Sequence, residues 1–247
     1  LKEQKKQRWF NMAEQKKRER YNIRISGLGG QGVVTTAHIL GSTMDNAGKY
    51  ASLVPFFGSE KRMAPVEAYV RASNQPIYEV GEVVYPDIIM IYHSQVVTHG
   101  KSYTMPFYTG LKPNSLIIIN TDHDVLTEDD IKVLEDLNAT VVQFDATALA
   151  LKIAGTELAT NMAMMGMLLG LTKLVTTENI EAAVRERFLG TSFVSSGGTA
   201  MLDSAIEKKF KKKEQLLEAN MNVINKTFEM ADSVDITGSE LIVRFDI

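Results

Sequence analysis

Four glycines within six residues mark the part of the chain best suited to bind an anion. They are Gly27, Gly29, Gly30 and Gly32, with Gln31 before the last of them. Glycine allows a tight turn and lets backbone N–H groups come close to a phosphate, and the N-terminus of a following helix adds partial positive charge. Because an alternating segment precedes the glycines and apolar residues at helical spacing follow them, we predict a phosphate-binding turn between a strand and a helix.

The same glycines satisfy the G-x-G-x-x-G pattern of dinucleotide-binding proteins. An NAD site of that type also needs an acidic residue about 20 residues further on, at the end of the second strand, where it holds the ribose. No acid occurs at residues 50–55, and Asp45 falls inside the predicted helix. An NAD(P)-binding protein therefore remains only as an alternative.

Residue types that carry redox or metal chemistry are scarce. The chain has no cysteine, so it forms no disulfide, offers no thiolate nucleophile and holds no Fe–S cluster, since those clusters need Cys ligands. The four histidines are His38, His93, His99 and His123. Their spacing matches no metal-binding motif, so we predict neither a metal site nor a catalytic residue in this chain.

Two almost unbroken apolar runs, at residues 87–92 and 115–120, predict strands buried on both faces. Such strands are typical of parallel sheets covered by helices, so the predicted fold is α/β: a three-layer, mostly parallel, Rossmann-like sheet with a C-terminal amphipathic helix extension. Further strands are predicted at residues 22–26, 66–72 and 139–144, and helices at 33–47, 128–138, 147–154, 159–174 and 177–188. Thr177 is the expected N-cap of the last helix, and residues 54–65 are expected to form a long loop.

Three segments complete the predicted organisation. The Met-rich stretch at residues 162–169 is apolar nearly all round and is expected in the core, the alternative being a contact with another subunit. Apolar residues from Ile206 to Phe228 recur at helical spacing and predict a long amphipathic helix. Residues 240–245 alternate weakly and predict an edge strand or a contact with a neighbour.

The charge distribution divides the chain. Residues 1–20 hold eight Lys and Arg against three Glu, whereas the remainder is acidic within a net charge of −3. We therefore expect a basic N-terminal extension over 1–20, an α/β domain over 21–200, and a C-terminal helix and tail over 201–247. Met12 resembles a natural start, which would make residues 1–11 an upstream extension or a fragment boundary.

The acidic body argues against nucleic-acid binding. No stretch resembles a signal peptide, and the longest apolar run is too short to span a membrane. We therefore expect no membrane insertion and a cytoplasmic location.

Several further motifs follow the glycine turn in a fixed order. The loop at residues 55–66 carries two adjacent cations, Lys61 and Arg62, between a pair of phenylalanines and a proline. After it come Pro76-Ile77, Pro86-Asp87, Gly110-Leu111-Lys112-Pro113, Asn120-Thr121 and the segment Asn161-Met162-Ala163-Met164-Met165-Gly166. Together these motifs resemble the gamma subunit of the 2-oxoacid:ferredoxin (acceptor) oxidoreductases, a family that includes the pyruvate, 2-oxoglutarate, 2-oxoisovalerate and phenylglyoxylate enzymes. The resemblance covers about residues 22–190.

The resemblance implies a reaction of a multi-subunit enzyme, in which a 2-oxoacid, CoA and an oxidised acceptor give acyl-CoA, carbon dioxide and reduced acceptor. In that family, alpha and beta subunits hold thiamine diphosphate. The [4Fe–4S] clusters lie in beta and ferredoxin-like (delta) subunits, and ferredoxin or another acceptor takes the electrons. The gamma domain is associated with binding CoA and closing over the thiamine site. A structural scaffold subunit without a CoA site is the alternative within the same family.

The resemblance also assigns roles to residues. The glycine turn is expected to receive a phosphate of CoA, Lys61 and Arg62 to neutralise further phosphate charge, and Asn161 to face the same cleft. The alternatives are a surface or intersubunit charge pair for the two cations, and capping or hydrogen bonding within its own helix for Asn161. In the family, small residues, commonly glycines, follow the cation. This chain departs from that pattern, because Met63-Ala64 stands there instead. A bulkier loop is expected to change how closely CoA approaches, or to shift the loop toward a subunit contact.

Overall fold

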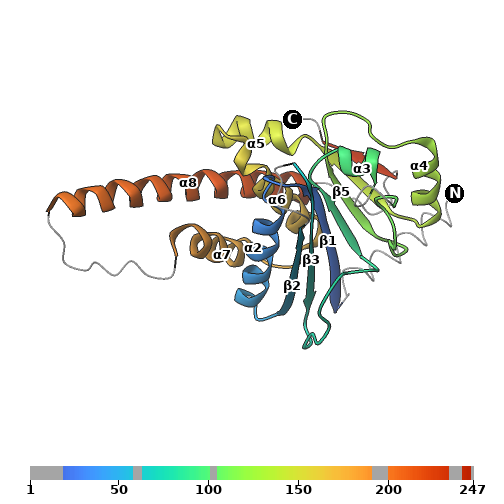
Figure 1. Cartoon of the computed structure of the whole chain (residues 1–247), viewed down its shortest axis with the longest axis horizontal. Helices are drawn as coiled ribbons and strands as arrows, with labels where there is room; N and C mark the ends of the chain where they lie inside the picture. Colours follow the sequence, from blue (N-terminus) through green and yellow to red (C-terminus); the bar gives the residue numbers. More distant parts are fainter. Residues whose placement is uncertain (1–18, 58–62, 101–104, 191–199, 234–240, 246–247) are drawn as a thin grey trace.

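The structure is a computed structural model that describes residues 19–57, 63–100, 105–190, 200–233 and 241–245, with the backbone alone at residue 57 and over 200–210 (Figure 1). Its strands are β1 (Arg20–Leu28), β2 (Tyr50–Phe57), β3 (Pro65–Ser73), β4 (Ile88–Ile91), β5 (Leu116–Asn120), β6 (Thr140–Phe144) and β7 (Ile242–Arg244). Its helices are α2 (Val33–Asn46), α3 (Gln95–His99), α4 (Glu128–Asp136), α5 (Ala146–Ala154), α6 (Thr160–Thr172), α7 (Thr177–Leu189) and α8 (Ala200–Asp232), with a 3-10 turn at Glu157–Ala159.

One sheet contains all seven strands, in the order β2-β3-β1-β4-β5-β6-β7. Five neighbouring strands, from β1 to β7, run parallel, and β3 is antiparallel to both β1 and β2. The predicted α/β fold with a mostly parallel sheet is therefore confirmed. The sequence predicted the strand that is β3, but it predicted neither its antiparallel insertion between β1 and β2 nor β2 itself.

Helices cover both faces of the sheet (Figure 1). On the first face α2, α5, α6, α7 and α8 form one apolar core with β1, β3, β4, β5 and β6. On the second face α3 and α4 form a smaller core with β4, β5 and β6. This arrangement confirms the three layers, and it leaves the second face of β1 and β3 to polar side chains.

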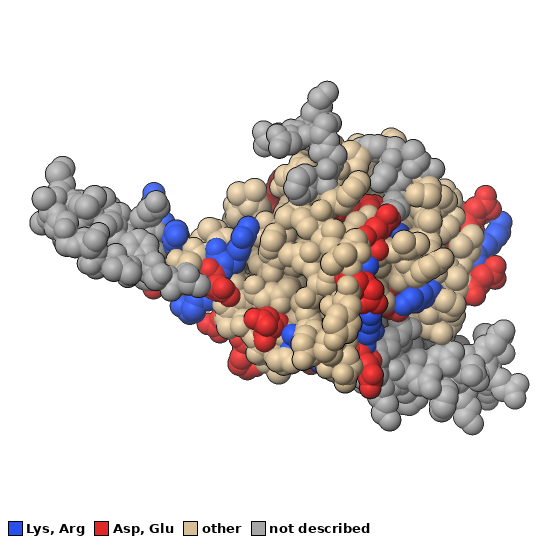
Figure 2. Space-filling view, turned by 60° about the horizontal axis from the view of Figure 1, so that its bottom comes forward, with Lys and Arg blue, Asp and Glu red and all other residues tan. Residues whose placement is uncertain are grey.

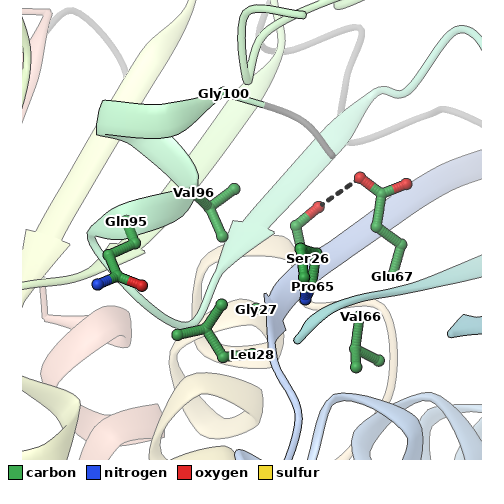
Figure 3. Close-up of a pocket in the computed structure, with 9 residues that line it drawn as sticks. All are labelled: Ser26, Gly27, Leu28, Pro65, Val66, Glu67, Gln95, Val96 and Gly100. Atoms are coloured by element: carbon green, nitrogen blue, oxygen red, sulfur yellow. Dashed lines mark hydrogen bonds between the residues drawn. The ribbon is translucent and has the colours of Figure 1, made fainter. Parts of the chain in front are cut away.

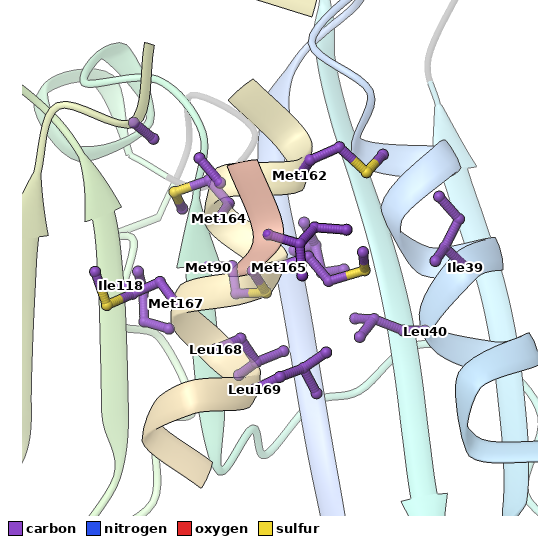
Figure 4. Packing of buried hydrophobic residues seen from close by; sticks show 14 of the residues in the cluster. Ile39, Leu40, Met90, Ile118, Met162, Met164, Met165, Met167, Leu168 and Leu169 are labelled. Atoms are coloured by element: carbon purple, nitrogen blue, oxygen red, sulfur yellow. The ribbon is translucent and has the colours of Figure 1, made fainter. Parts of the chain in front are cut away.

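Helix α6 is buried on all sides, because every residue from Thr160 to Gly170 is buried. Figure 4 shows its methionines and leucines packed against the sheet, with α2 beside α6 on the same face. This confirms the prediction that the Met-rich stretch lies in the core. The opposite side of α6 packs closely against α8. A Cβ added to Gly166 would lie 2.0 Å from Thr227 Oγ1 and 2.5 Å from the carbonyl oxygen of Ile224. A Cβ on Gly170 would lie 2.6 Å from the carbonyl oxygen of Phe228.

The loop predicted at residues 54–65 is wrong at both ends. Residues 54–57 belong to β2 and Pro65 begins β3, while residues 58–62, between them, lie outside the described part. Pro55 is compatible with β2 because β2 pairs only with β3 and is an edge strand, where a missing N–H breaks no inner ladder. Phe56 and Phe57 supply the aromatic content that strands favour.

The predicted N-cap of α7 is wrong by one residue. Thr176, not Thr177, precedes the helix in an extended conformation and forms a capping box with Asn179. The reason lies in the spacing, because a capping box needs its partner three residues after the N-cap. The other predicted helices and strands lie within a few residues of the observed ones.

The C-terminal segments join the main body. The predicted long helix is α8, whose last turns pack against α6 and α7, while its N-terminal part extends past α7 (Figure 1). The weak alternation at residues 240–245 does form an edge strand, since β7 pairs parallel to β6. The division of the chain near residue 200 stays a prediction.

The α6–α8 contact makes a prediction about stability. Gly166→Ala should lower the free energy of unfolding by about 1–3 kcal/mol, since the new methyl group meets the backbone of α8. Gly41→Ala is the matched control, because Gly41 lies inside α2 with nothing within 4 Å of an added Cβ. It should raise stability by up to about 1 kcal/mol. Urea unfolding followed by circular dichroism measures both, and equal effects would contradict the close packing.

Candidate functional site

The glycine turn lies where the sheet changes direction of winding. β1 has β3 on one side and β4 on the other, and α2 leads away from β1 toward the β3–β2 edge. The ends of β1 and β4 stay together up to the turn, since the N–H of Tyr92 donates to the carbonyl of Ser26 at 2.9 Å. Ligands of open α/β sheets bind outside the carboxyl ends of the strands at such a switch point.

Gln31 holds the turn together from within. Its Oε1 accepts from the N–H of Leu28 at 2.8 Å, and its own N–H donates to the carbonyl of Leu28 at 3.2 Å. Its Nε2 donates to the carbonyl of Tyr92 at 3.3 Å, which also accepts from Asn120 Nδ2 at 3.1 Å. The amide of Gln31 therefore ties the turn to the ends of β4 and β5.

The glycines of the turn serve different purposes. Gly27 is a packing position, because a Cβ there would lie 2.9 Å from both Tyr92 Cβ and Val33 Cγ2. Gly30 and Gly32 have φ angles of 103° and 79°, a region that side chains other than glycine rarely adopt. Gly32 is also the N-cap of α2, with no side chain capping the helix and no acidic residue in its first turn. The first N–H groups of α2 therefore carry the partial positive charge of the helix dipole without a side-chain cap.

Asn161, the second residue of α6, lies against this helix N-terminus. A Cβ on Gly32 would lie 2.6 Å from Asn161 Nδ2. The residue is 5% exposed, and within the described part of the chain its Oδ1 has no hydrogen-bond partner. Rotation of the amide exchanges its oxygen and nitrogen, so the side chain can offer either an acceptor or a donor to a ligand. The structure therefore brings Asn161 and the glycine turn together, and the role of Asn161 toward a ligand stays a prediction.

Lys61 and Arg62 lie outside the described residues, and their roles stay predictions. The next residues along the chain are attached to the turn. The N–H of Gly29 donates to the carbonyl of Ala64 at 2.8 Å, and the N–H of Met63 donates to the carbonyl of Gly29 at 3.3 Å. Met63 has a φ of 68°, which is strained for a side chain with a Cβ. A glycine would relieve this strain, which gives a physical reason for the small residues that the family pattern has after the cation.

Burial shifts the pKa of two side chains at the end of β4 toward their uncharged forms. Burial raises the pKa of the Tyr92 hydroxyl, which shares a hydrogen bond of 2.8 Å with Thr36 Oγ1. Burial lowers the pKa of His93, whose Nδ1 accepts from the N–H of Gln95 at 3.2 Å.

The strand next to β1 on the glycine-turn side is β3, not the second strand of the chain. Residues 50–55 lie in β2, which does not touch β1, because β3 runs between them. The residue beside the end of β1 is instead Glu67, which pairs in register with Ser26 on the neighbouring strand. A signal for it was present, since polar residues alternate along β3. They are Glu67, Tyr69, Arg71 and Ser73, and all four are buried.

Comparison with known proteins decides the family. Residues 22–201 match the family described as pyruvate ferredoxin/flavodoxin oxidoreductase. The chain belongs to this family. It is 35% identical over 168 residues to the pyruvate/ketoisovalerate oxidoreductases common subunit gamma of Thermococcus kodakarensis, covering 68% of this chain and 86% of that one. It is 34% identical over 168 residues to the pyruvate synthase subunit PorC of Methanothermobacter marburgensis, with the same coverage.

Solved structures of the family have the same fold. The pyruvate oxidoreductase subunit PORC of Thermotoga maritima superposes with a TM-score of 0.62 at 21% identity, covering 86% of this chain and 97% of that one. The 2-oxoglutarate:ferredoxin oxidoreductase of Magnetococcus marinus gives a TM-score of 0.61 at 16% identity, covering 88% of this chain and 32% of that one. The chain therefore corresponds to gamma subunits of the family over most of their length, and to about a third of the longer enzyme.

Three further observations concern surface charge, membrane-spanning helices and metal ligands. On the face in Figure 2, Lys and Arg lie in small groups among Asp and Glu. In the described part of the chain, no helix combines the length and the apolar character needed to cross a membrane. The described residues also contain no group of three or more His, Asp or Glu placed to hold a metal ion.

The backbone of Met63 makes a second prediction. The free energy of unfolding of Met63→Gly should exceed that of Met63→Ala by about 0.5–1 kcal/mol, because only glycine relieves the left-handed strain. The alanine variant controls for loss of the exposed side chain. Chemical denaturation of the two variants and the natural chain measures the difference, and an alanine variant as stable as the glycine variant would show that the strain is absent.

Proposed function

We propose that this chain is the gamma subunit of a 2-oxoacid:ferredoxin (acceptor) oxidoreductase and that it supplies the domain that binds CoA and closes the active site. The reaction is that of the family: a 2-oxoacid, CoA and an oxidised acceptor give acyl-CoA, carbon dioxide and reduced acceptor. The observation that carries the proposal is the uncapped N-terminus of α2 behind Gly30 and Gly32, with the buried amide of Asn161 against it.

The chemistry of CoA suits this arrangement. Its phosphates carry several negative charges, and open N–H groups at a helix N-terminus bind phosphate without a charged side chain. Lys61 and Arg62 precede Met63, whose backbone is bonded to Gly29, so we propose that they neutralise further phosphate charge. The Magnetococcus marinus enzyme, which shares this fold over a third of its chain, was solved with CoA and succinyl-CoA bound.

The remaining chemistry belongs to partner subunits in this proposal. The chain has no cysteine for a [4Fe–4S] cluster, so alpha, beta and ferredoxin-like (delta) subunits hold the clusters and thiamine diphosphate. Ferredoxin or another acceptor takes the electrons. This chain contributes no catalytic residue, and the side chain of the 2-oxoacid is recognised elsewhere. The related gamma subunits act in pyruvate and ketoisovalerate enzymes, which makes pyruvate and 2-oxoisovalerate the first substrates to assay.

The glycine turn can be tested in the purified complex. Gly30→Ala should raise KM for CoA about tenfold, equivalent to about 1.4 kcal/mol, because alanine resists the φ of 103° and the N–H groups lose their alignment. Gly48→Ala is the matched control: Gly48 also has a positive φ and open space, but it lies in the turn between α2 and β2. Its KM for CoA should stay within about twofold of the natural complex.

Anoxic purification followed by steady-state kinetics with CoA as the varied substrate provides the measurement. An unchanged KM in Gly30→Ala would overturn the CoA site and leave a scaffold role. An isolated chain that reduces NAD(P) by itself would overturn the proposed place in a complex.

A further inference from the structure

The loop between β3 and β4 is much longer than its path requires. It consists of residues 74–87. β3 and β4 are separated only by β1, a distance of about 10 Å at the usual strand spacing, which about three or four residues would span. The loop lies at the end of the sheet where β1 begins, away from the glycine turn (Figure 1). Irregular loops of this length are uncommon in compact domains and are usually functional.

The β3–β4 loop exposes large apolar side chains. Glu79 turns toward the sheet, where its carboxylate pairs with Arg20 at 2.7 Å. Successive side chains of an extended segment point to opposite sides, so the neighbours of Glu79 point away from the sheet. Four of the large apolar side chains that are exposed in the described part of the chain belong to this loop: Tyr78 at 86%, Val80 at 88%, Val84 at 56% and Tyr85 at 66%.

The polar second face of β1 and β3 holds this loop in place. Near the glycine turn the polar side chains bind one another, since Ser26 Oγ donates to Glu67 Oε1 at 3.5 Å (Figure 3). Toward the start of β1, Arg71 instead donates to the carbonyls of Gly81 and Glu82 in the loop, at 2.9 and 2.8 Å. The buried guanidinium of Arg71 therefore fixes the middle of the loop to β3.

A second segment of the chain braces the loop. Arg24, which is buried in β1, donates to the carbonyls of Phe107 and Thr109. The segment that Arg24 holds packs directly on the loop, since a Cβ added to Gly110 would lie 2.0 Å from the carbonyl oxygen of Val84. A loop fixed in this way loses little conformational entropy when a partner binds to it, which favours association.

The composition of the loop determines the kind of partner that it suits. Residues 74–87 contain no Lys or Arg, and the nearby Arg20 and Lys112 are paired with Glu79 and Asp87. Such a surface does not attract the phosphates of a nucleic acid or of an anionic membrane. Tyrosine, in contrast, is enriched at protein interfaces, because its ring buries a large apolar area while its hydroxyl forms hydrogen bonds. The loop therefore suits an apolar protein surface.

The size of the exposed surface and the use of this fold elsewhere favour a different subunit as the partner. A tyrosine buries about 150–250 Å² when it is covered, so the two tyrosines supply a sizeable part of the roughly 800 Å² that one side of a stable interface buries. In the Magnetococcus marinus enzyme the same fold forms about a third of a longer chain, where it is joined to other domains and not to a copy of itself alone.

We propose that the β3–β4 loop is a docking surface for another subunit of the same complex, one that presents an apolar face, with Tyr78 and Val80 at the centre of the contact. The inference rests on the proposed function and adds an attachment region to it, at the end of the sheet opposite the glycine turn. Arg24 and Arg71 are positioning residues in this assignment, because they hold the loop and its brace against the sheet.

The test uses the complex purified under anoxic conditions and measures the dissociation constant of this chain from it by mass photometry on dilution. Val80→Lys should raise that constant about tenfold or more, because the interface has to bury an unpaired charge. Tyr78→Ala should raise it about tenfold without adding charge. Leu151→Lys is the matched control, since Leu151 is 51% exposed on α5, which covers the other face of the sheet. It should leave the constant within about twofold.

Thermal unfolding of the isolated chains shows whether the variants fold. Val80→Lys and Leu151→Lys should unfold at the temperature of the natural chain, because exposed positions tolerate polar side chains. If Val80→Lys unfolds at a lower temperature, Tyr78→Ala decides. In the assembled Tyr78→Ala complex, KM for CoA should stay within about twofold, whereas Gly30→Ala should raise KM and leave the dissociation constant unchanged.

The outcomes keep the two proposals apart. A natural chain that purifies without any other subunit would reject the proposed function. A natural chain that assembles, with Val80→Lys and Tyr78→Ala assembling equally well, would overturn the docking surface alone. Equal weakening by Leu151→Lys would also overturn it, since the effect would not belong to the loop. A dimer of the isolated chain that Val80→Lys dissociates would show that a second copy occupies the loop, which contradicts the assignment to another subunit.

Discussion

The structure depends on the burial of α6, a helix without a polar face. Each of its buried methionines and leucines contributes about 1.5–3 kcal/mol when it leaves water, so every side of the helix needs a cover. The sheet and α2 cover one side, and α8 covers the other at a distance that only Gly166 and Gly170 permit. The same requirement determines where α6 begins, and its second residue, Asn161, consequently lies against Gly32. The position of a candidate ligand-binding side chain thus follows from core packing.

Much of the fold could be predicted because its strongest signals are local. The apolar runs of β4 and β5 indicate strands buried on both faces, and the glycine turn marks the junction of β1 and α2. β2 was missed because Pro55 indicates a loop unless the strand is known to be an edge strand, which depends on pairing that the sequence does not display. The insertion of β3 between β1 and β2 is likewise a property of long-range pairing.

The site was predictable in part for the same reason. The turn is contiguous in sequence, whereas Glu67 becomes its neighbour only through the antiparallel pairing of β3 with β1. The alternation of buried polar residues along β3 was a usable signal, since a strand that hides its polar face must pair those groups. The roles within the turn were not predictable, because Gly27 and Gly32 differ in what surrounds them and not in type. Only the three-dimensional neighbours show that Gly27 is a packing position and Gly32 an N-cap.

The two faces of β1 have opposite electrostatic character, and this follows from strand geometry. Successive side chains of a strand point to opposite faces, so Ile25 enters the core under α2 while Ser26 faces Glu67. Beyond the end of the strand, the first face offers the positive end of a helix dipole and the second face offers a carboxylate. The alternation along β1 thus separates the partial positive charge at the N-terminus of α2 from the buried carboxylate of Glu67.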